Sequence, residues 1–217
     1  MKVLIVGSGG REHALSWKIS KSPLVKEIFV APGNGGTELE NSIINIDIQA
    51  DDIEGLAQFA INEKIDLTII GPENPLVNGI TDKFEESGLR CFGPSKGAAQ
   101  LEGSKEFMKD FLKKYNIPTA EYSAFTDPIK AIDYVREKGC PIVIKADGLA
   151  AGKGVTIANN IDEAKEAIDL ALESEIFGEA GRKIVIEEFL SGEEASFIVM
   201  TDGINAIPFP TSQDHKA

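Results

Sequence analysis

The sequence is poor in the residues that form disulfides and metal clusters. Its 217 residues include two cysteines and two histidines. Cys91 and Cys140 lie at the start of or inside apolar runs without Cys-x-x-Cys spacing, which predicts buried, reduced thiols and argues against a disulfide or a metal ligand. With only His13 and His215, a histidine metal cluster is excluded, so we predict no metal-ligating residues in this chain. Reduced thiols indicate a cytoplasmic protein.

Basic residues are also scarce, and long apolar runs are missing. The chain has 22 Lys and Arg against 35 Asp and Glu, a net charge of −13. Such a charge repels the phosphates of nucleic acids and of anionic membranes. No apolar run is long enough to span a membrane, and Met1 is followed directly by a strand pattern instead of a signal peptide. We therefore predict neither nucleic-acid nor membrane partners, and small anionic ligands must be bound by local donors.

The first part of the chain alternates strand and helix patterns. This order predicts an α/β fold with a doubly wound parallel sheet. Its expected strands are Val3–Val6, Ile28–Ala31, Ile43–Ile46, Leu67–Ile70 and Leu89–Phe92, and its expected helices are Arg11–Ser20, Ile53–Glu63 and Asn78–Ser87. We place this domain at residues 1–102.

The second part predicts a smaller α+β unit. Ser104 can cap a helix over Lys105–Tyr115, and Asp127-Pro128 begins another helix that Gly139 ends. A strand at Lys145, a second strand from Val155, a helix over Asp162–Glu173 and a strand from Ile184 complete it, at about residues 118–190. Ala195–Met200 begins a further sheet, and the whole second region covers residues 103–217.

The glycine-rich segment after the Lys145 strand has the composition of a phosphate-binding loop. Gly148, Ala151, Gly152 and Gly154 leave the backbone N–H groups accessible, and Lys145 and Lys153 add positive charge. The Walker pattern fails, because three residues separate Gly148 from Gly152 and a strand follows instead of a helix. The segment therefore predicts a flap between two strands of a hairpin. The alternative is a flexible glycine turn with solvated lysines.

An acidic hinge follows the strand that begins at Ile184. Glu187, Glu188, Phe189 and Leu190 form its end, and an acidic turn that includes Glu194 comes next. Strand-end backbone suits the edge of an adenine, and carboxylates suit ribose hydroxyls. Together with the flap and its lysines, the hinge indicates ATP.

The first glycine turn, Gly7 to Glu12, stands between a strand and a helix but is no dinucleotide fingerprint. Glu12 occupies the third glycine position, and the second strand ends in Ala31-Pro32-Gly33-Asn34 without a ribose-binding acid. The helix start still favours an anion, so we predict a substrate phosphate here. Asn34 and Glu73 follow other strands at the same sheet edge. A turn needed only for packing, and a solvated Glu73, are the alternatives.

The chain resembles the glycinamide ribonucleotide synthetase family of ATP-grasp enzymes. The resemblance runs from the first strand to the last residues. It is carried by Gly7–His13, Ala31–Asn34, Gly71–Glu73, Gln100–Lys105, Lys145–Gly154, Ile186–Leu190 and Ser212–Lys216.

The resemblance implies a Rossmann-like substrate-binding domain, an ATP-grasp domain and a ligase. ATP would phosphorylate glycine, and the amine of 5-phosphoribosylamine would attack the glycyl phosphate. Lys105 and Lys145 would contact the ATP phosphates as the catalytic residues, with Gly148, Ala151, Gly152, Lys153 and Gly154 closing over them. Glu187, Glu188, Phe189 and Leu190 would hold the adenine and Glu194 the ribose. The implied substrate-binding residues are Gly9, Gly10, Arg11, Asn34, Glu73, Asp214 and Lys216.

The family pattern continues beyond residue 217, where the resemblance places the ligands of Mg²⁺. We therefore expect a truncated chain that does not complete the ligation alone. Two further readings are a nucleotide- or phosphoribosyl-binding module without catalysis, and a related ATP-grasp ligase for another purine intermediate. A dehydrogenase fits least.

Overall fold

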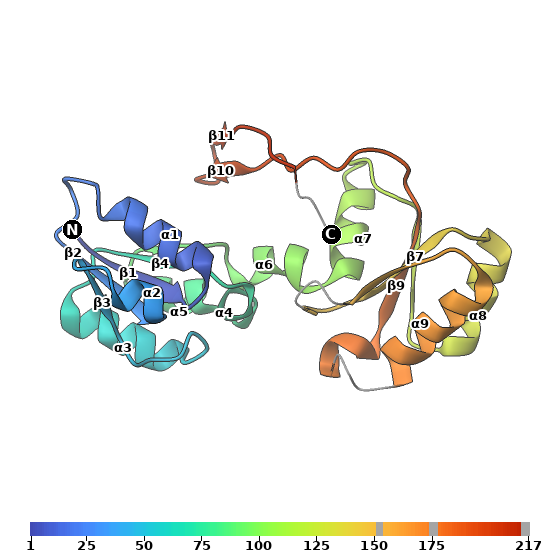
Figure 1. The fold of residues 1–217 in the computed structure, drawn as a ribbon, viewed down its shortest axis with the longest axis horizontal. Helices are drawn as coiled ribbons and strands as arrows, with labels where there is room; N and C mark the ends of the chain where they lie inside the picture. The colour runs from blue at the N-terminus through green and yellow to red at the C-terminus, as the bar shows by residue number, and fades with distance from the viewer. Residues whose placement is uncertain (151–153, 174–177, 214–217) are drawn as a thin grey trace.

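The first unit of the molecule is a five-stranded parallel sheet. The computed structural model describes residues 1–150, 154–173 and 178–213 (Figure 1). Strand order in the first sheet is β3-β2-β1-β4-β5, and every neighbouring pair is parallel. The strands are β1 Lys2–Gly7, β2 Glu27–Pro32, β3 Ile43–Asn45, β4 Leu67–Ile70 and β5 Cys91–Phe92. The predicted doubly wound α/β fold is confirmed.

Helices cover both faces of this sheet, which explains why its central strand is a continuous apolar run. Leu4 and Val6 of β1 belong to one buried cluster, and Val3 and Ile5 belong to another on the opposite face. The helices of this unit are α1 Gly10–Ile19, α2 Gly35–Glu38, α3 Ile53–Glu63, α4 Glu73–Asn78 and α5 Ile80–Glu86.

Two sequence-based boundaries in this unit are wrong. The helix expected over Asn78–Ser87 is α5, which begins only at Ile80, because Gly79 is left-handed with φ 95° and separates it from α4, a helix that the sequence analysis did not predict. The strand expected over Leu89–Phe92 is limited to Cys91–Phe92, which pairs only with Thr68 and Ile69 of β4.

Two consecutive helices, α6 Lys96–Gly103 and α7 Lys105–Lys114, lead from the first sheet to the second (Figure 1). Ser104 separates them, and its hydroxyl accepts the Phe107 N–H at 3.1 Å. The predicted cap of α7 is therefore confirmed.

The second unit is a four-stranded antiparallel sheet with order β6-β9-β7-β8. Helices α8 and α9 pack against one face of it, around Ile144, Ile168 and Ile186. This confirms the α+β unit, although the sequence analysis did not anticipate β6. The elements are β6 Tyr122–Phe125, α8 Pro128–Lys138, β7 Ile142–Ala146, β8 Val155–Ala158, α9 Ile161–Glu173, the 3-10 helix η1 Gly178–Arg182 and β9 Ile184–Glu188.

A short hairpin follows the second unit, made of β10 Val199–Thr201 and β11 Ala206–Pro208. The strand expected from Ala195 begins only at Val199. Apolar side chains of this hairpin are exposed, with Ile204 at 92% and Ile207 at 66%. Figure 1 shows it away from both larger sheets.

Candidate functional site

The glycine-rich flap connects two neighbouring antiparallel strands, as the sequence predicts. Lys145 of β7 stands opposite Val155 of β8, and the Ala146 N–H donates to the Gly154 carbonyl at 2.8 Å to close the base of the hairpin. A Cβ at Gly148 would lie 2.8 Å from Ala180 Cβ, so glycine permits a close approach to η1. Ala151, Gly152 and Lys153 lie outside the described residues.

The flap base is attached to the start of α7. Asp147 accepts hydrogen bonds from the Ser104 hydroxyl and from the Glu106 N–H at 2.7 Å. Lys105 donates its backbone N–H to the Asp147 carbonyl at 3.0 Å and its Nζ to the Gly148 carbonyl at 2.9 Å. Burial lowers the pKa of Lys105, partly opposed by Asp147.

A cavity of about 350 Å³ lies between the flap and the first unit. It brings together three residues that the sequence analysis selected far apart in the chain, Glu73, Lys105 and Gly148. Its walls are Glu73, Asn74, Glu102, Lys105, Gly148, Leu149, Ala150, Gly154 and Val155. Lysine, bare backbone and carboxylates at one cavity suit a ligand that carries both phosphate and hydroxyl groups.

Lys145 is held by the buried carboxylate of Glu187, a residue whose backbone the sequence analysis assigned to adenine. Glu187, 4% exposed, accepts from Lys145 Nζ at 3.0 Å and from Lys109 Nζ at 2.9 Å, both at Oε2. Lys109 is 3% exposed and was missed from the sequence. Its only signal was a lysine inside the apolar pattern of α7, which ordinarily marks a side chain that reaches solvent.

Within the described residues, the hinge residues that follow Glu187 do not line the cavity beside Lys105. Glu188 ends β9 and accepts the Glu121 N–H at 3.3 Å, and Phe189 and Glu188 line a separate cavity of about 280 Å³ with Tyr134 and Lys138. Leu190 and Glu194 are exposed. Glu188 and Phe189 thus line a different cavity from the one that Lys105 lines.

The first glycine turn, where the sequence analysis predicts a substrate phosphate, holds a carboxylate of the protein itself. The Gly9 N–H donates to Glu12 Oε2 at 2.7 Å, and the Glu12 carboxylate is buried. A Cβ at Gly7 or Gly71 would come within 2.6 Å or 2.1 Å of the Glu12 side chain, so these glycines make room for it. A substrate phosphate at this N–H would meet a carboxylate already in place.

Arg11 links this turn to Glu73. Its Nε donates to Glu12 Oε1 at 3.2 Å, and its Nη1 and Nη2 donate to Glu73 Oε1 at 3.3 Å. The first turns of α1 and α4 are therefore joined through one guanidinium. Arg11 therefore contacts a residue that lines the cavity.

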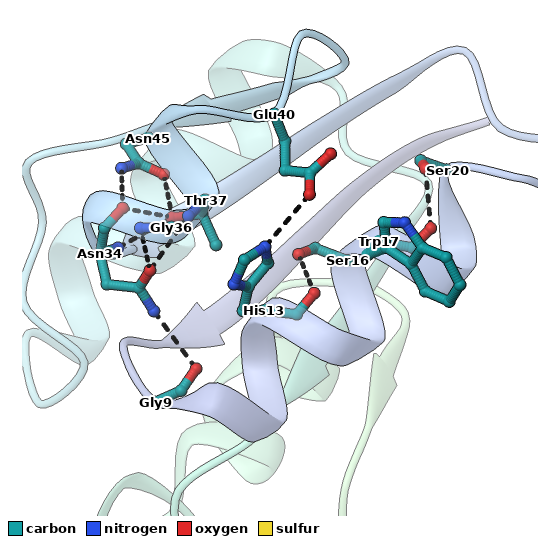
Figure 2. Close-up of polar contacts among 10 residues, drawn as sticks. All are labelled: Gly9, His13, Ser16, Trp17, Ser20, Asn34, Gly36, Thr37, Glu40 and Asn45. Atoms are coloured by element: carbon teal, nitrogen blue, oxygen red, sulfur yellow. Dashed lines mark hydrogen bonds and ion pairs between the residues drawn. The ribbon is translucent and has the colours of Figure 1, made fainter.

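Asn34 is likewise engaged within the protein. Figure 2 shows its amide nitrogen directed to Gly9, while its Oδ1 accepts the N–H groups of Gly36 and Thr37 at 2.7 and 3.0 Å. The side chain caps α2 and fixes the first turn. Nearby, His13 Nε2 lies 3.3 Å from Glu40 Oε1. Asp214 and Lys216, with His215, lie outside the described residues.

The described part of the chain contains no cluster of three or more His, Cys, Asp or Glu suited to a metal, and none of its helices is long and apolar enough to cross a membrane. Cys91 and Cys140 are both free thiols.

Comparison with protein families gives matches over the entire length. Residues 1–102 match "Phosphoribosylglycinamide synthetase, N domain", and residues 103–217 match "Phosphoribosylglycinamide synthetase, ATP-grasp (A) domain". Phosphoribosylamine–glycine ligases of Escherichia coli O6:H1 and Haemophilus influenzae are 62% and 60% identical over 216 residues. These alignments cover 100% of this chain and 50% of each relative. The chain therefore spans about half the length of the curated relatives it matches.

Solved structures give the same result. The phosphoribosylamine–glycine ligase of Thermotoga maritima superposes with a TM-score of 0.79 at 32% identity, over 97% of this chain and 49% of that one. A biotin carboxylase domain from Hydrogenobacter thermophilus, crystallised with MgADP, reaches 0.75 at 20% identity over 97% of this chain and 49% of that one, which shows a shared fold alone.

Proposed function

Because the chain belongs to the phosphoribosylglycinamide synthetase family, we propose that it forms the substrate-binding and flap-bearing part of an ATP-dependent ligase. The ligase would join glycine to 5-phosphoribosylamine. The relatives are named for this ligation, and the chain aligns with them from end to end. We keep residues 1–102 as the substrate domain and 103–217 as part of the ATP-grasp domain.

The proposed reaction has two steps. The γ-phosphoryl group of ATP passes to a carboxylate oxygen of glycine, which gives ADP and glycyl phosphate. The amine of phosphoribosylamine then attacks the glycyl carbonyl, the bond to phosphate breaks, and the amine loses a proton. Activation is needed because a free carboxylate has no leaving group that an amine can displace.

The observation that carries the proposal is the cavity between Lys105, Glu73 and the flap. Lys105 and Lys145 supply positive charge for the phosphates, and the backbone of Gly148 and Gly154 supplies small, accessible surface. Glu73 and Glu102 face the same cavity, where carboxylates suit an amine or sugar hydroxyls. Glu187 to Leu190 and Glu194 remain our proposal for adenine and ribose. Gly10, Arg11, Asp214 and Lys216 remain proposed for phosphoribosylamine. Gly9, Asn34 and Glu73 remain proposed for phosphoribosylamine as well, and Gly9 and Asn34 also shape the turn.

Magnesium is a further expectation for this family, but the described residues contain no cluster that fits it. We derive no step through it and place its ligands outside the described residues. We also propose a cytoplasmic location, in which the free thiols of Cys91 and Cys140 stay reduced.

The test is an ADP-release assay on the protein at its natural length, with ATP, glycine and phosphoribosylamine. ADP release that requires both glycine and phosphoribosylamine is expected. Binding of ATP without glycine-dependent ADP release would instead favour the module without catalysis, and release with a different purine intermediate would favour the related ligase.

A further inference from the structure

A buried charge cluster beneath the proposed phosphate site contains a lysine that no ligand can touch. Glu187 of β9 receives two ammonium groups at one oxygen, from Lys109 of α7 at 2.9 Å and from Lys145 of β7 at 3.0 Å. Lys109 and Glu187 are 3% and 4% exposed, whereas the Lys145 side chain is 26% exposed. The three residues come from three separate elements that converge at one carboxylate.

The Lys109 ammonium group is held by partners within the protein. Besides Glu187, its Nζ donates to Thr119 Oγ1 at 2.8 Å and to the Ala120 carbonyl at 3.4 Å. An ammonium group has three N–H donors, so these partners use all of them. Lys109 therefore has no donor left for a ligand, and its ion-pair partner is Glu187.

Glu187 depends on its two lysines. Its second oxygen, Oε1, is buried and has no hydrogen-bond partner among the described residues. Two lysines and one carboxylate leave one positive charge in the cluster. Without Lys109 the carboxylate would be balanced by Lys145 alone, and the cluster would be neutral. A buried carboxylate that loses one of its two ion-pair partners interacts more strongly with the other.

We propose that Lys109 is a positioning residue for nucleotide binding: it neutralises Glu187 from the buried side and so leaves the Lys145 charge available to a triphosphate. The inference rests on the proposed function, which makes ATP the ligand. The cluster lies next to the cavity, since both Lys145 and Glu187 are close enough to Lys105, which lines it, to influence its protonation. The role is electrostatic, so it concerns the phosphates and not the adenosine part of the ligand.

The test compares ATP with adenosine in the protein at its natural length. Lys109→Met should weaken ATP binding about tenfold, the scale of one charge-assisted contact, while adenosine affinity stays unchanged in calorimetry. Lys113→Met is the matched control, because Lys113 is exposed on the same helix. It should change neither affinity.

A double variant separates charge from packing. Lys109→Met with Glu187→Gln removes one charge of each sign, restores the positive cluster and should recover ATP affinity to within about threefold of the unmodified protein. If Lys109→Met does not fold, the double variant, which carries no uncompensated carboxylate, provides the measurement by itself.

Three results would overturn the inference: ATP affinity unchanged in a folded Lys109→Met variant, equal loss of ATP and adenosine affinity, or no recovery in the double variant. Failure of the proposed function looks different, because then the unmodified protein would bind no ATP.

Discussion

The two glycine-rich turns of this molecule look alike in sequence and differ in what occupies them. The turn after β1 is closed by its own carboxylate, since Glu12 accepts the Gly9 N–H and fills the space between Gly7 and Gly71. The turn after β7 borders a cavity, where Gly148 and Gly154 stand beside Lys105. Glycine therefore makes a turn accessible, and the nearest side chain decides whether a ligand can use it.

Charge explains the difference. The buried Glu12 carboxylate lies at the start of α1, where the helix dipole favours an anion, so the protein already supplies the negative group. Near the flap, the carboxylate of Glu187 is paired with two lysines, which leaves one positive charge in that cluster. One turn satisfies its own donors, and the other retains charge for a ligand.

The largest expected effect is on the open turn. Lys145→Ala should weaken ATP binding by about one to two decades, or roughly 1.5–3 kcal/mol, because a charge-assisted contact to phosphate is lost. Calorimetry on the protein at its natural length measures this, with Lys130→Ala on the exposed side of α8 as control. Unchanged affinity in the folded variant would remove Lys145 from the site and weaken the contrast between the turns.

The next effect is on the stability of the closed turn. Glu12→Ala should lower the free energy of unfolding by about 1–3 kcal/mol, because the Gly9 N–H loses its side-chain partner and the buried space that Glu12 fills beside Gly7 and Gly71 is left empty. Urea unfolding measures it, with Glu38→Ala, an exposed residue of α2, as control. ATP affinity should not change. Wild-type stability of the Glu12 variant would mean that the carboxylate is not needed to close the turn.

A smaller effect distinguishes two adjacent glycines. A Cβ at Gly9 would lie 2.8 Å from Glu12 Oε2, whereas a Cβ at Gly10 meets nothing within 4 Å. Gly9→Ala should therefore cost about 1 kcal/mol, and Gly10→Ala should be neutral or slightly stabilising. The unfolding midpoint of Gly9→Ala should therefore be lower than that of Gly10→Ala. Equal midpoints would show that Glu12 moves aside easily and that the turn is less closed than its contacts indicate.

The smallest effect is on pH dependence. Burial lowers the pKa of Lys105, so in the unliganded protein its proton leaves at a lower pH than that of a free lysine. ATP affinity should then fall with rising pH, starting below the ordinary lysine pKa of about 10.4, and Lys105→Met should remove that part of the decline.

The stability of the unliganded protein should change in the opposite direction. Between the lowered pKa of Lys105 and the ordinary value, the unfolded state binds more protons, so the Lys105 contribution to stability rises with pH. Thermal unfolding without ligand, compared between the unmodified protein and Lys105→Met, checks the sign. A contribution that falls with pH would contradict the lowered pKa.

The sequence predicts the regular elements well where a pattern is local. Asp127 and Ser104 cap the helices expected after them, and the continuous apolar run of β1 indicates a strand buried on both faces. The left-handed Gly79 was missed, because a glycine inside a helical pattern is compatible with either continuation or a break.

The site was predicted less completely, because its decisive contacts join distant segments. Lys145 and Glu187 are 42 residues apart, and Lys109 reaches Glu187 from another element. A buried lysine cannot be distinguished by sequence from a solvated one, since burial depends on what packs around it. The sequence analysis also did not predict that Glu12 fills the first turn. The only indication was that Glu12 is the residue at which this turn departs from the dinucleotide pattern.

Asp147 has a mechanical consequence for the flap. It is the first residue after β7, and it holds the Ser104 hydroxyl and the Glu106 N–H, so the root of the flap and the first turn of α7 share one anchor. Any displacement of the flap root must therefore either pull on α7 or break these bonds. The position of the flap root is therefore coupled to that of Lys105 through a helix some forty residues earlier in the chain.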